Sequence, residues 1–219
     1  MKKRHNLNNP LLDVYYDNPN EASDMYLKHL KKDCEANGIE VRVFDNLCDW
    51  EDAEENGDGE LYLEPIATTD IMINWHKNSI FNVDRDSATA TGICEHIKET
   101  YPRKTVIGVI GRGLVGKQLI NKLIDCGYTV LEFNSQTDSS TLYGMCYWYC
   151  DIIVGLATSD KPIFGEGFCN NLTKKGVTLI DASNNFDTKN KLRCGKWTRD
   201  VIVRRVIENF DTFNKRLNS

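Results

Sequence analysis

Three glycines near the middle of the chain have the spacing of a phosphate-binding turn. Gly111, Gly113 and Gly116 form Gly-x-Gly-x-x-Gly directly after an apolar run at 105–110. In a dinucleotide-binding turn the first glycine permits a tight turn, the second lets the backbone approach a pyrophosphate, and the third lets the helix pack closely on the strand. The phosphates then bind N–H groups at the helix N-terminus. The predicted cofactor-binding residues of this turn are Gly111, Arg112, Gly113, Leu114, Val115 and Gly116.

Polar residues after the next expected strand bear on the choice of nicotinamide cofactor. NAD sites usually carry Asp or Glu at the end of that strand, where the carboxylate binds the ribose diol. Here Asn-Ser-Gln-Thr follows the strand at 134–137, and Glu132 lies too early in it. Neutral donors tolerate a 2′-phosphate and Arg112 could supply positive charge, although an isolated arginine is more often a solvated surface residue. We therefore predict NADP, with NAD less favoured, bound in part by Ser135 and Thr137.

Apolar periodicity predicts the elements that position these residues. The first half shows strands at 11–16 and 39–44, a helix at 21–37 and an apolar segment at 71–75. Strands at 105–110, 128–133, 151–157 and 176–183 then alternate with helices at 87–99, 117–126 and 166–171, and a last helix covers 199–217. Because strands alternate with helices, the sheet should be parallel.

These elements predict an α/β fold of two lobes, the second a Rossmann-type doubly wound parallel sheet. The expected domains are a substrate lobe at 1–86, a linking helix with the dinucleotide-binding lobe at 87–190, and a C-terminal helix at 191–219 that returns to the first lobe. A ligand cleft is expected between the lobes.

Composition narrows the classes of partner. The 219 residues carry 27 basic and 32 acidic side chains, a formal charge of −5, so nothing in the balance favours nucleic acid or an anionic membrane. No segment approaches the apolar length of a membrane span, and no apolar run follows the basic N-terminal residues. We expect a cytoplasmic protein with a small-molecule substrate.

Cysteine and charge patterns predict no metal site. The eight cysteines include no Cys-x-x-Cys pair, and the four histidines lack ligand spacing. Cys146 and Cys150 could share a helix face, which leaves a redox or metal role as the minor alternative. The acidic run at 49–60 reads as solvated rather than as a calcium loop. The basic residues after Asn185 read as a solvated helix face rather than as a phosphate- or RNA-binding strip.

Several segments, in order along the chain, resemble the bifunctional methylenetetrahydrofolate dehydrogenase/cyclohydrolase family. The pattern Asn-Pro-x-x-Ala-Ser-x-x-Tyr at 18–26 and the segment 31–39 resemble the family's signature helix, and 134–137 resembles its His-Ser-x-Thr. Weaker likenesses lie at 70–74, 82–84, 89–93, 151–154 and 179–185. The resemblance implies a folate-derivative substrate, NADP and a homodimer.

Departures from the family pattern fall on its catalytic residues. The family's lysine lies one helical turn after the signature Tyr26, and this chain has Leu30 there. Lys31 and Lys32 are rotated away from that position, although Lys32 matches a second lysine of the family. Asn74 replaces the partner glutamine, and the Gly-Gly-Val-Gly-Pro loop near the C-terminus is absent. Part of the segment that builds the folate pocket is also missing.

The resemblance and the departures together imply a dehydrogenase with weak or lost cyclohydrolase activity. Hydride transfer chiefly needs two reactants held close together, whereas the cyclohydrolase step needs a group that moves protons, which leucine cannot do. The implied catalytic residues are Tyr26, Lys32, Asn74 and Asp84. Tyr26 would order the pterin or the reacting nitrogen and Asp84 would hydrogen-bond the pterin, unless Tyr26 only packs and Asp84 only caps a turn.

Three alternatives stay open. The chain could be a non-catalytic relative that binds nucleotide or folate as a sensor or assembly partner. It could be a dehydrogenase of another small substrate such as a 2-hydroxy acid, because the glycine turn is also typical of those enzymes. It could also be an interaction protein that retains only the fold.

Overall fold

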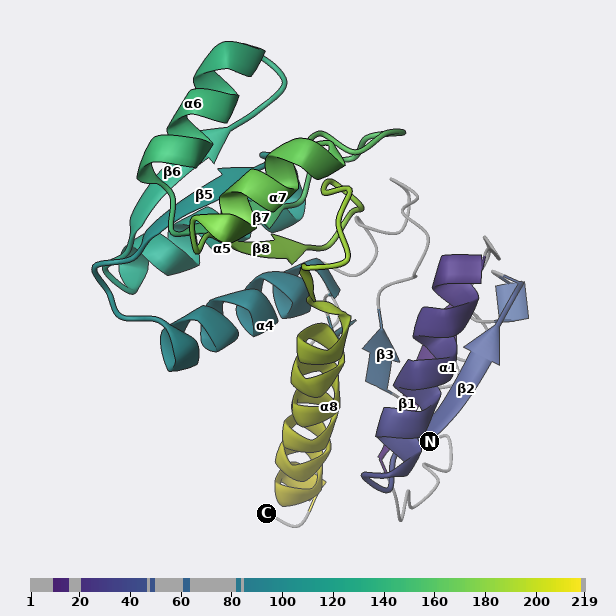
Figure 1. Ribbon diagram of the computed structural model, residues 1–219. Coiled ribbons are helices and arrows are strands. Elements are labelled where there is room, and N and C mark those ends of the chain that lie inside the picture. Colours follow the sequence, from purple (N-terminus) through teal and green to yellow (C-terminus); the bar gives the residue numbers. More distant parts are fainter. Residues whose placement is uncertain are drawn as a thin grey trace. The chain divides into compact units, whose positions relative to one another are not determined.

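The computed structural model describes residues 10–15, 21–46, 48–49, 61–63, 82–83 and 85–217. The chain forms two compact units, one of residues 1–88 with 199–219 and one of residues 89–198 (Figure 1). The division falls within the helices α4 (Arg85–Thr100) and α8 (Gly195–Leu217). Both units are mixed α/β, as predicted.

The second unit is built on a five-stranded parallel sheet with the order β6-β5-β7-β8-β9. The strands are β5 (Val106–Ile110), β6 (Thr129–Phe133), β7 (Ile152–Gly155), β8 (Thr178–Asp181) and β9 (Leu192–Arg193). The chain adds β6 on one side of β5 and then returns to add β7 on the other side. In open α/β sheets the carboxyl ends of strands at such a reversal form the ligand-binding crevice.

Helices cover both faces of this sheet because consecutive strand residues point to opposite faces (Figure 1). Ile152 and Val154 of β7 join the core made with α4 and α5 (Leu114–Asp125), whereas Ile153 joins the core made with α6 (Ser139–Tyr149) and α7 (Glu166–Lys174). The predicted Rossmann-type doubly wound sheet is therefore confirmed.

The first unit contains a four-stranded parallel sheet with the order β2-β1-β3-β4. The strands are β1 (Leu11–Tyr15), β2 (Glu40–Phe44), β3 (Leu61–Leu63) and β4 (Asn82–Val83). Helix α1 (Glu21–Glu35) and the part of α8 from residue 199 onward share one buried core with β1. Leu12, Leu30 and Ile202 are members of that core.

Several elements differ from the sequence prediction. Helix α6 was not predicted, because apolar and aromatic residues run all round it and leave no amphipathic period. Its start signal is Asp138, whose side chain accepts a hydrogen bond from the Thr141 N–H (2.9 Å). Helix α5 begins at Leu114 rather than at 117, because Gly113 is its N-cap. The predicted apolar segment 71–75 lies outside the described residues.

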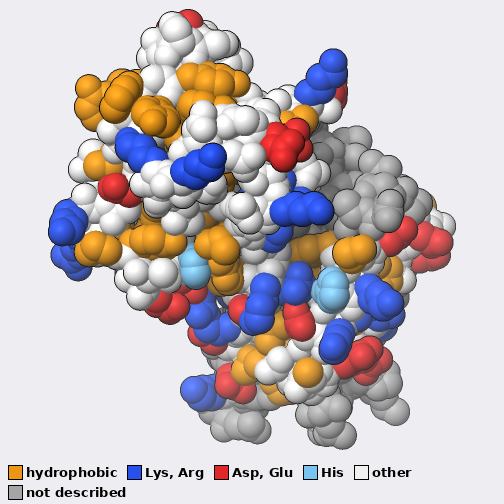
Figure 2. Space-filling model, viewed as in Figure 1, with side chains coloured by type: hydrophobic (Ala, Val, Ile, Leu, Met, Phe, Trp, Pro, Cys, Tyr) orange, Lys and Arg blue, Asp and Glu red, His pale blue; other side chains and the backbone are white. Residues whose placement is uncertain are grey.

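The charge distribution on the surface and the apolar character of the helices relate to two predicted absences, those of a nucleic-acid partner and of a membrane partner. Figure 2 shows basic and acidic side chains interspersed over the viewed face. In the described part of the chain, no helix combines the length and the apolar character needed to cross a bilayer.

Candidate dinucleotide-binding site

The glycine turn connects β5 to α5 at the reversal point of the sheet. Gly111 has a φ of 107°, which favours glycine, and a Cβ there would lie 2.6 Å from the backbone nitrogen of Ala157. The Gly111 N–H donates to the carbonyl oxygen of Phe133 (2.9 Å). The first glycine of the motif is therefore held between the end of β6 and the segment that follows β7.

Glycine fits positions 116 and 113 for different physical reasons. A Cβ at Gly116 would lie 2.0 Å from the carbonyl oxygen of Gly111, so only glycine lets the helix approach the turn this closely. Gly113 has no atom within 4 Å of its Cβ position, so that side of the turn is open. The second glycine leaves room for a ligand, whereas the first and third are required by packing.

The N-terminus of α5 meets the requirements of a phosphate site. Gly113 caps the helix without a side-chain hydrogen bond, and the first turn carries no acidic residue. The N–H groups of a helix's first turn lack partners within the helix and attract anions. Leu114 is exposed and Val115 is half-buried. The structure therefore places the six predicted residues together at the turn between β5 and the N-terminus of α5, and their binding of phosphate stays a prediction.

The loop after β6 closes on itself. The Asn134 N–H donates to Thr137 Oγ1 (3.1 Å), and the Gln136 N–H donates to Asn134 Oδ1 (2.8 Å). Thr137 therefore shapes the loop, whereas the side chain of Ser135 is exposed. Cofactor binding by Ser135 and Thr137 stays a prediction.

Arg112 is paired rather than simply solvated. Its Nε lies 3.3 Å from Glu132 Oε2, and the two side chains are 58% and 38% exposed. The sequence placed Glu132 too early in β6 to take part in the site. The structure shows that its carboxylate reaches the glycine turn, a relationship that depends on the pairing of β6 with β5.

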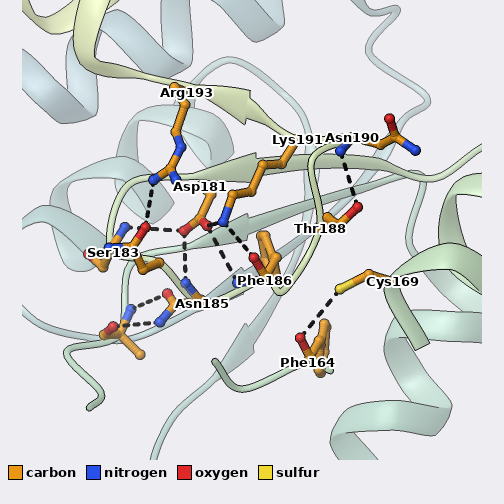
Figure 3. A network of polar contacts seen from close by, with 12 residues as sticks. Phe164, Cys169, Asp181, Ser183, Asn185, Phe186, Thr188, Asn190, Lys191 and Arg193 are labelled. Carbon is orange, nitrogen blue, oxygen red and sulfur yellow. Dashed lines mark hydrogen bonds and ion pairs between the residues drawn. The ribbon is translucent and has the colours of Figure 1, made fainter. Parts of the chain in front are cut away.

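A buried polar network lies at the carboxyl ends of β7 and β8 (Figure 3). Asp181 is 1% exposed and pairs with Lys191 Nζ (2.6 Å), and it also accepts a hydrogen bond from the Asn185 N–H (2.9 Å). The Asn185 side chain donates to the Ala157 carbonyl (2.7 Å) and accepts from the Ala157 N–H (3.0 Å). Since Ala157 abuts Gly111, the network supports the glycine turn from behind.

The residues of this network were not predicted as site residues. Their contacts also correct the interpretation of the basic residues after Asn185. The basic residues after Asn185 were predicted to form a solvated face. Lys191 instead pairs with Asp181 and leaves only 11% of its side chain exposed, and Arg199 Nε lies 2.6 Å from Asp33 Oδ2. The signal in the sequence was Asp181 at the end of an apolar strand, with a lysine ten residues later.

Two of the four predicted catalytic residues, Tyr26 and Lys32, lie within the described part of the first unit. Tyr26 is half-buried on α1, with the Arg199 guanidinium 5.8 Å from its ring centroid, whereas Lys32 is exposed. Leu30, at the family's lysine position, is fully buried in the core shared with α8. Asn74 and Asp84 lie outside the described residues.

Cys146 and Cys150, for which a redox or metal role was the minor alternative, belong to one buried core. Both thiols are buried, and the hydrogen bond with Cys150, together with burial, raises the pKa of Cys146 far above its ordinary value. Redox and metal chemistry need the thiolate, which this environment disfavours. Among the described residues, no three His, Cys, Asp or Glu side chains are grouped so that they could hold a metal ion.

The fold and the glycine turn together define a two-unit α/β protein whose second unit has a Rossmann-type fold. Neither a protein-family model nor a curated protein sequence matches the chain. Among solved structures it is similar to the NAD-dependent 5,10-methylenetetrahydrofolate dehydrogenase from Saccharomyces cerevisiae, with a TM-score of 0.70, 15% identity, and coverage of 94% of this chain and 88% of that one.

Two further structures show the same likeness. The methylenetetrahydrofolate dehydrogenase from the silkworm Bombyx mori matches with a TM-score of 0.68 and 16% identity over 95% of this chain and 90% of that one. The dehydrogenase-cyclohydrolase from Trypanosoma brucei, complexed with NADP and inhibitor, matches with a TM-score of 0.68 and 14% identity, over 93% and 87%. The resemblance predicted from the sequence is thus confirmed at the level of the fold.

Proposed function

We propose that the protein is an oxidoreductase of the methylenetetrahydrofolate dehydrogenase type. It would bind a nicotinamide dinucleotide and a folate derivative and catalyse hydride transfer from methylenetetrahydrofolate. The observation that carries the proposal is the glycine turn, in which Gly111 and Gly116 are required by packing while Gly113 leaves open space at a helix N-terminus that has no side-chain cap.

The residues of the second unit would bind and orient the cofactor. The bound dinucleotide supplies the hydride acceptor. The N–H groups of the first turn of α5 would hold its pyrophosphate, with Gly113 allowing the backbone to approach. Asn185 holds the Ala157 backbone against Gly111 and so preserves the shape of the turn. The neutral loop with Ser135 supports NADP, whereas Glu132 beside Arg112 supports NAD.

The first unit supports weak or absent cyclohydrolase activity. Leu30 cannot transfer a proton, and its place in the core leaves no exposed position for a catalytic group there. Tyr26 is the predicted residue for ordering the folate, and the cation–π contact with Arg199 restricts its ring. Lys32, Asn74 and Asp84 remain predictions as catalytic residues, as does the homodimer.

The activity experiment separates the two steps. Purified protein would be mixed with methylenetetrahydrofolate and either NAD or NADP, and the absorbance of the reduced nicotinamide would be followed. Hydrolysis of methenyltetrahydrofolate would be followed separately. We expect reduced nicotinamide to form and methenyltetrahydrofolate to decay at the rate without protein. Protein-dependent hydrolysis with no hydride transfer would contradict the proposal.

A second candidate is a non-catalytic relative that binds the nucleotide as a sensor or assembly partner. The observation that favours it is Leu30, which stands at the family's lysine position, is buried in the hydrophobic core and cannot transfer a proton. Dinucleotide binding without any turnover of methylenetetrahydrofolate would select this candidate.

A further inference from the structure

We infer that Glu132 determines which nicotinamide dinucleotide the site prefers, by pairing with Arg112 and placing a carboxylate beside the glycine turn. The intact pair favours NAD, and loss of Glu132 shifts the preference toward NADP. This inference rests on the proposed dinucleotide site and specifies its selectivity.

The position of Glu132 follows from the register of β6. Glu132 lies opposite Val109 of β5, and the next residue, Phe133, accepts the hydrogen bond from the Gly111 N–H. The Phe133 side chain belongs to the core on the α6 and α7 face, so Glu132 projects to the α5 face. That is the face on which the glycine turn leads into its helix, and the 3.3 Å contact with Arg112 confirms the direction.

The exposure of the pair makes both groups available to a ligand. More than a third of each side chain is accessible, and ion pairs this exposed contribute little to stability. Separating the Arg112 and Glu132 side chains would therefore cost the fold little stability. A bound nucleotide can therefore take the Glu132 carboxylate as its own partner.

The two cofactors make opposite demands on this pair. The 2′- and 3′-hydroxyls of NAD donate hydrogen bonds to a carboxylate at the end of the second strand of the unit, whereas the 2′-phosphate of NADP is repelled by one and needs a cation. Glu132 supplies the carboxylate and at the same time neutralises Arg112. The charge that sequence reasoning assigned to the 2′-phosphate is thus already engaged.

The next carboxylate along the chain, that of Asp138, is engaged in hydrogen bonds of its own. Asp138 Oδ1 accepts hydrogen bonds from the Thr141 N–H (2.9 Å) and the Ser140 hydroxyl (2.6 Å) at the start of α6. These hydrogen bonds hold the pKa of the Asp138 carboxyl far below its ordinary value. The intervening loop at 134–137 contains no acidic residue. Glu132 is therefore the carboxylate that the site can use.

The test is equilibrium binding of NAD and of NADP, measured by isothermal titration calorimetry on the wild type and on Glu132→Gln. We expect the wild type to prefer NAD, and Glu132→Gln to raise the ratio of NADP affinity to NAD affinity by about fivefold or more. Arg112→Gln should lower NADP affinity. The matched control is Glu166→Gln, an exposed glutamate in the first turn of α7 with the same change of charge, which should leave the ratio unchanged.

The outcomes separate this inference from the function on which it rests. If both nucleotides bind and Glu132→Gln shifts their ratio no more than Glu166→Gln does, the selectivity role is overturned and the dinucleotide site stands. If neither nucleotide binds to the wild type or to Glu132→Gln, the site itself is overturned, and the inference falls with it.

Discussion

The carbonyl oxygen of Gly111 occupies the place where a side chain at position 116 would begin, because a Cβ built on Gly116 would lie 2.0 Å from it. This contact fixes how closely α5 approaches the turn. It also makes the third glycine of the motif a structural requirement that stability measurements can detect without any ligand.

Gly116→Ala should destabilise the protein by about 1–3 kcal/mol, because the backbone oxygen cannot yield without moving the turn. The measurement is the free energy of unfolding in urea. Gly144→Ala is the matched control, since Gly144 lies in α6 with nothing within 4 Å of its Cβ position. That substitution should stabilise by about 1 kcal/mol through helix propensity. Equal effects of the two substitutions would show that the close approach is not maintained in solution.

Lys191→Met should cost about 3–5 kcal/mol, because it leaves the buried carboxylate of Asp181 without its ion partner. The backbone donors to Asp181 remain, which favours the lower end of that range. Urea unfolding of Lys191→Met would be compared with that of Lys189→Met, which removes an exposed lysine two positions away. Unfolding of the two variants at the same urea concentration would contradict a stabilising role for the Asp181–Lys191 pair.

His96 should make stability depend on pH. Its Nε2 is buried without a hydrogen bond and its ring stacks on Trp197 with a centroid separation of 3.8 Å. Burial lowers the pKa of His96 below its ordinary value of 6.5, and the charge of Glu99 opposes this only in part. A lowered pKa in the folded state means that the stabilisation is complete above the ordinary pKa and is lost as the pH falls below it.

The measurement for His96 is the unfolding free energy of the wild type and of His96→Phe between neutral and mildly acidic pH. Phenylalanine keeps the stacking and cannot titrate. The wild type should lose stability relative to His96→Phe as the pH falls through 6.5. A difference that is constant with pH would rule out the buried, neutral histidine.

Leu30→Lys should not restore cyclohydrolase activity, although it recreates the family's residue in sequence. The side chain would enter the hydrophobic core with its charge unpaired, which costs several kcal/mol. Leu30→Met, which conserves volume, should cost less than about 1.5 kcal/mol. Thermal unfolding and the methenyltetrahydrofolate assay together test this, and a stable, hydrolytically active Leu30→Lys would show that position 30 faces substrate.

Local sequence signals were sufficient for the turn and its flanking elements. The apolar run of β5, the three glycines, and Gly127 with its φ of 85° after α5 each act within a few residues, so the sequence specifies them directly. The fold class followed from the alternation of strands and helices. Helix α6 could not be predicted from apolar periodicity, because its aromatic residues give no single apolar face.

The rest of the site depends on contacts between distant parts of the chain. The pairing of Arg112 with Glu132 depends on the register between β5 and β6. The hydrogen bond from the Ala157 N–H to Asn185 Oδ1 depends on the approach of the segments that follow β7 and β8. The burial of Leu30 depends on α8, which lies far along the chain. Sequence spacing carries none of this information.

The most direct test of the central claim is dinucleotide binding to Gly113→Asp, measured by isothermal titration calorimetry. Gly165→Asp is the matched control, because Gly165 is the N-cap of α7, has a similar extended backbone and also has open space at its Cβ position. Aspartate is a favourable N-cap, so both variants should fold. We predict that the wild type and Gly165→Asp bind a nicotinamide dinucleotide and that Gly113→Asp does not. Binding that survives in Gly113→Asp, or is absent from the wild type, would contradict the assignment of the glycine turn as the cofactor site.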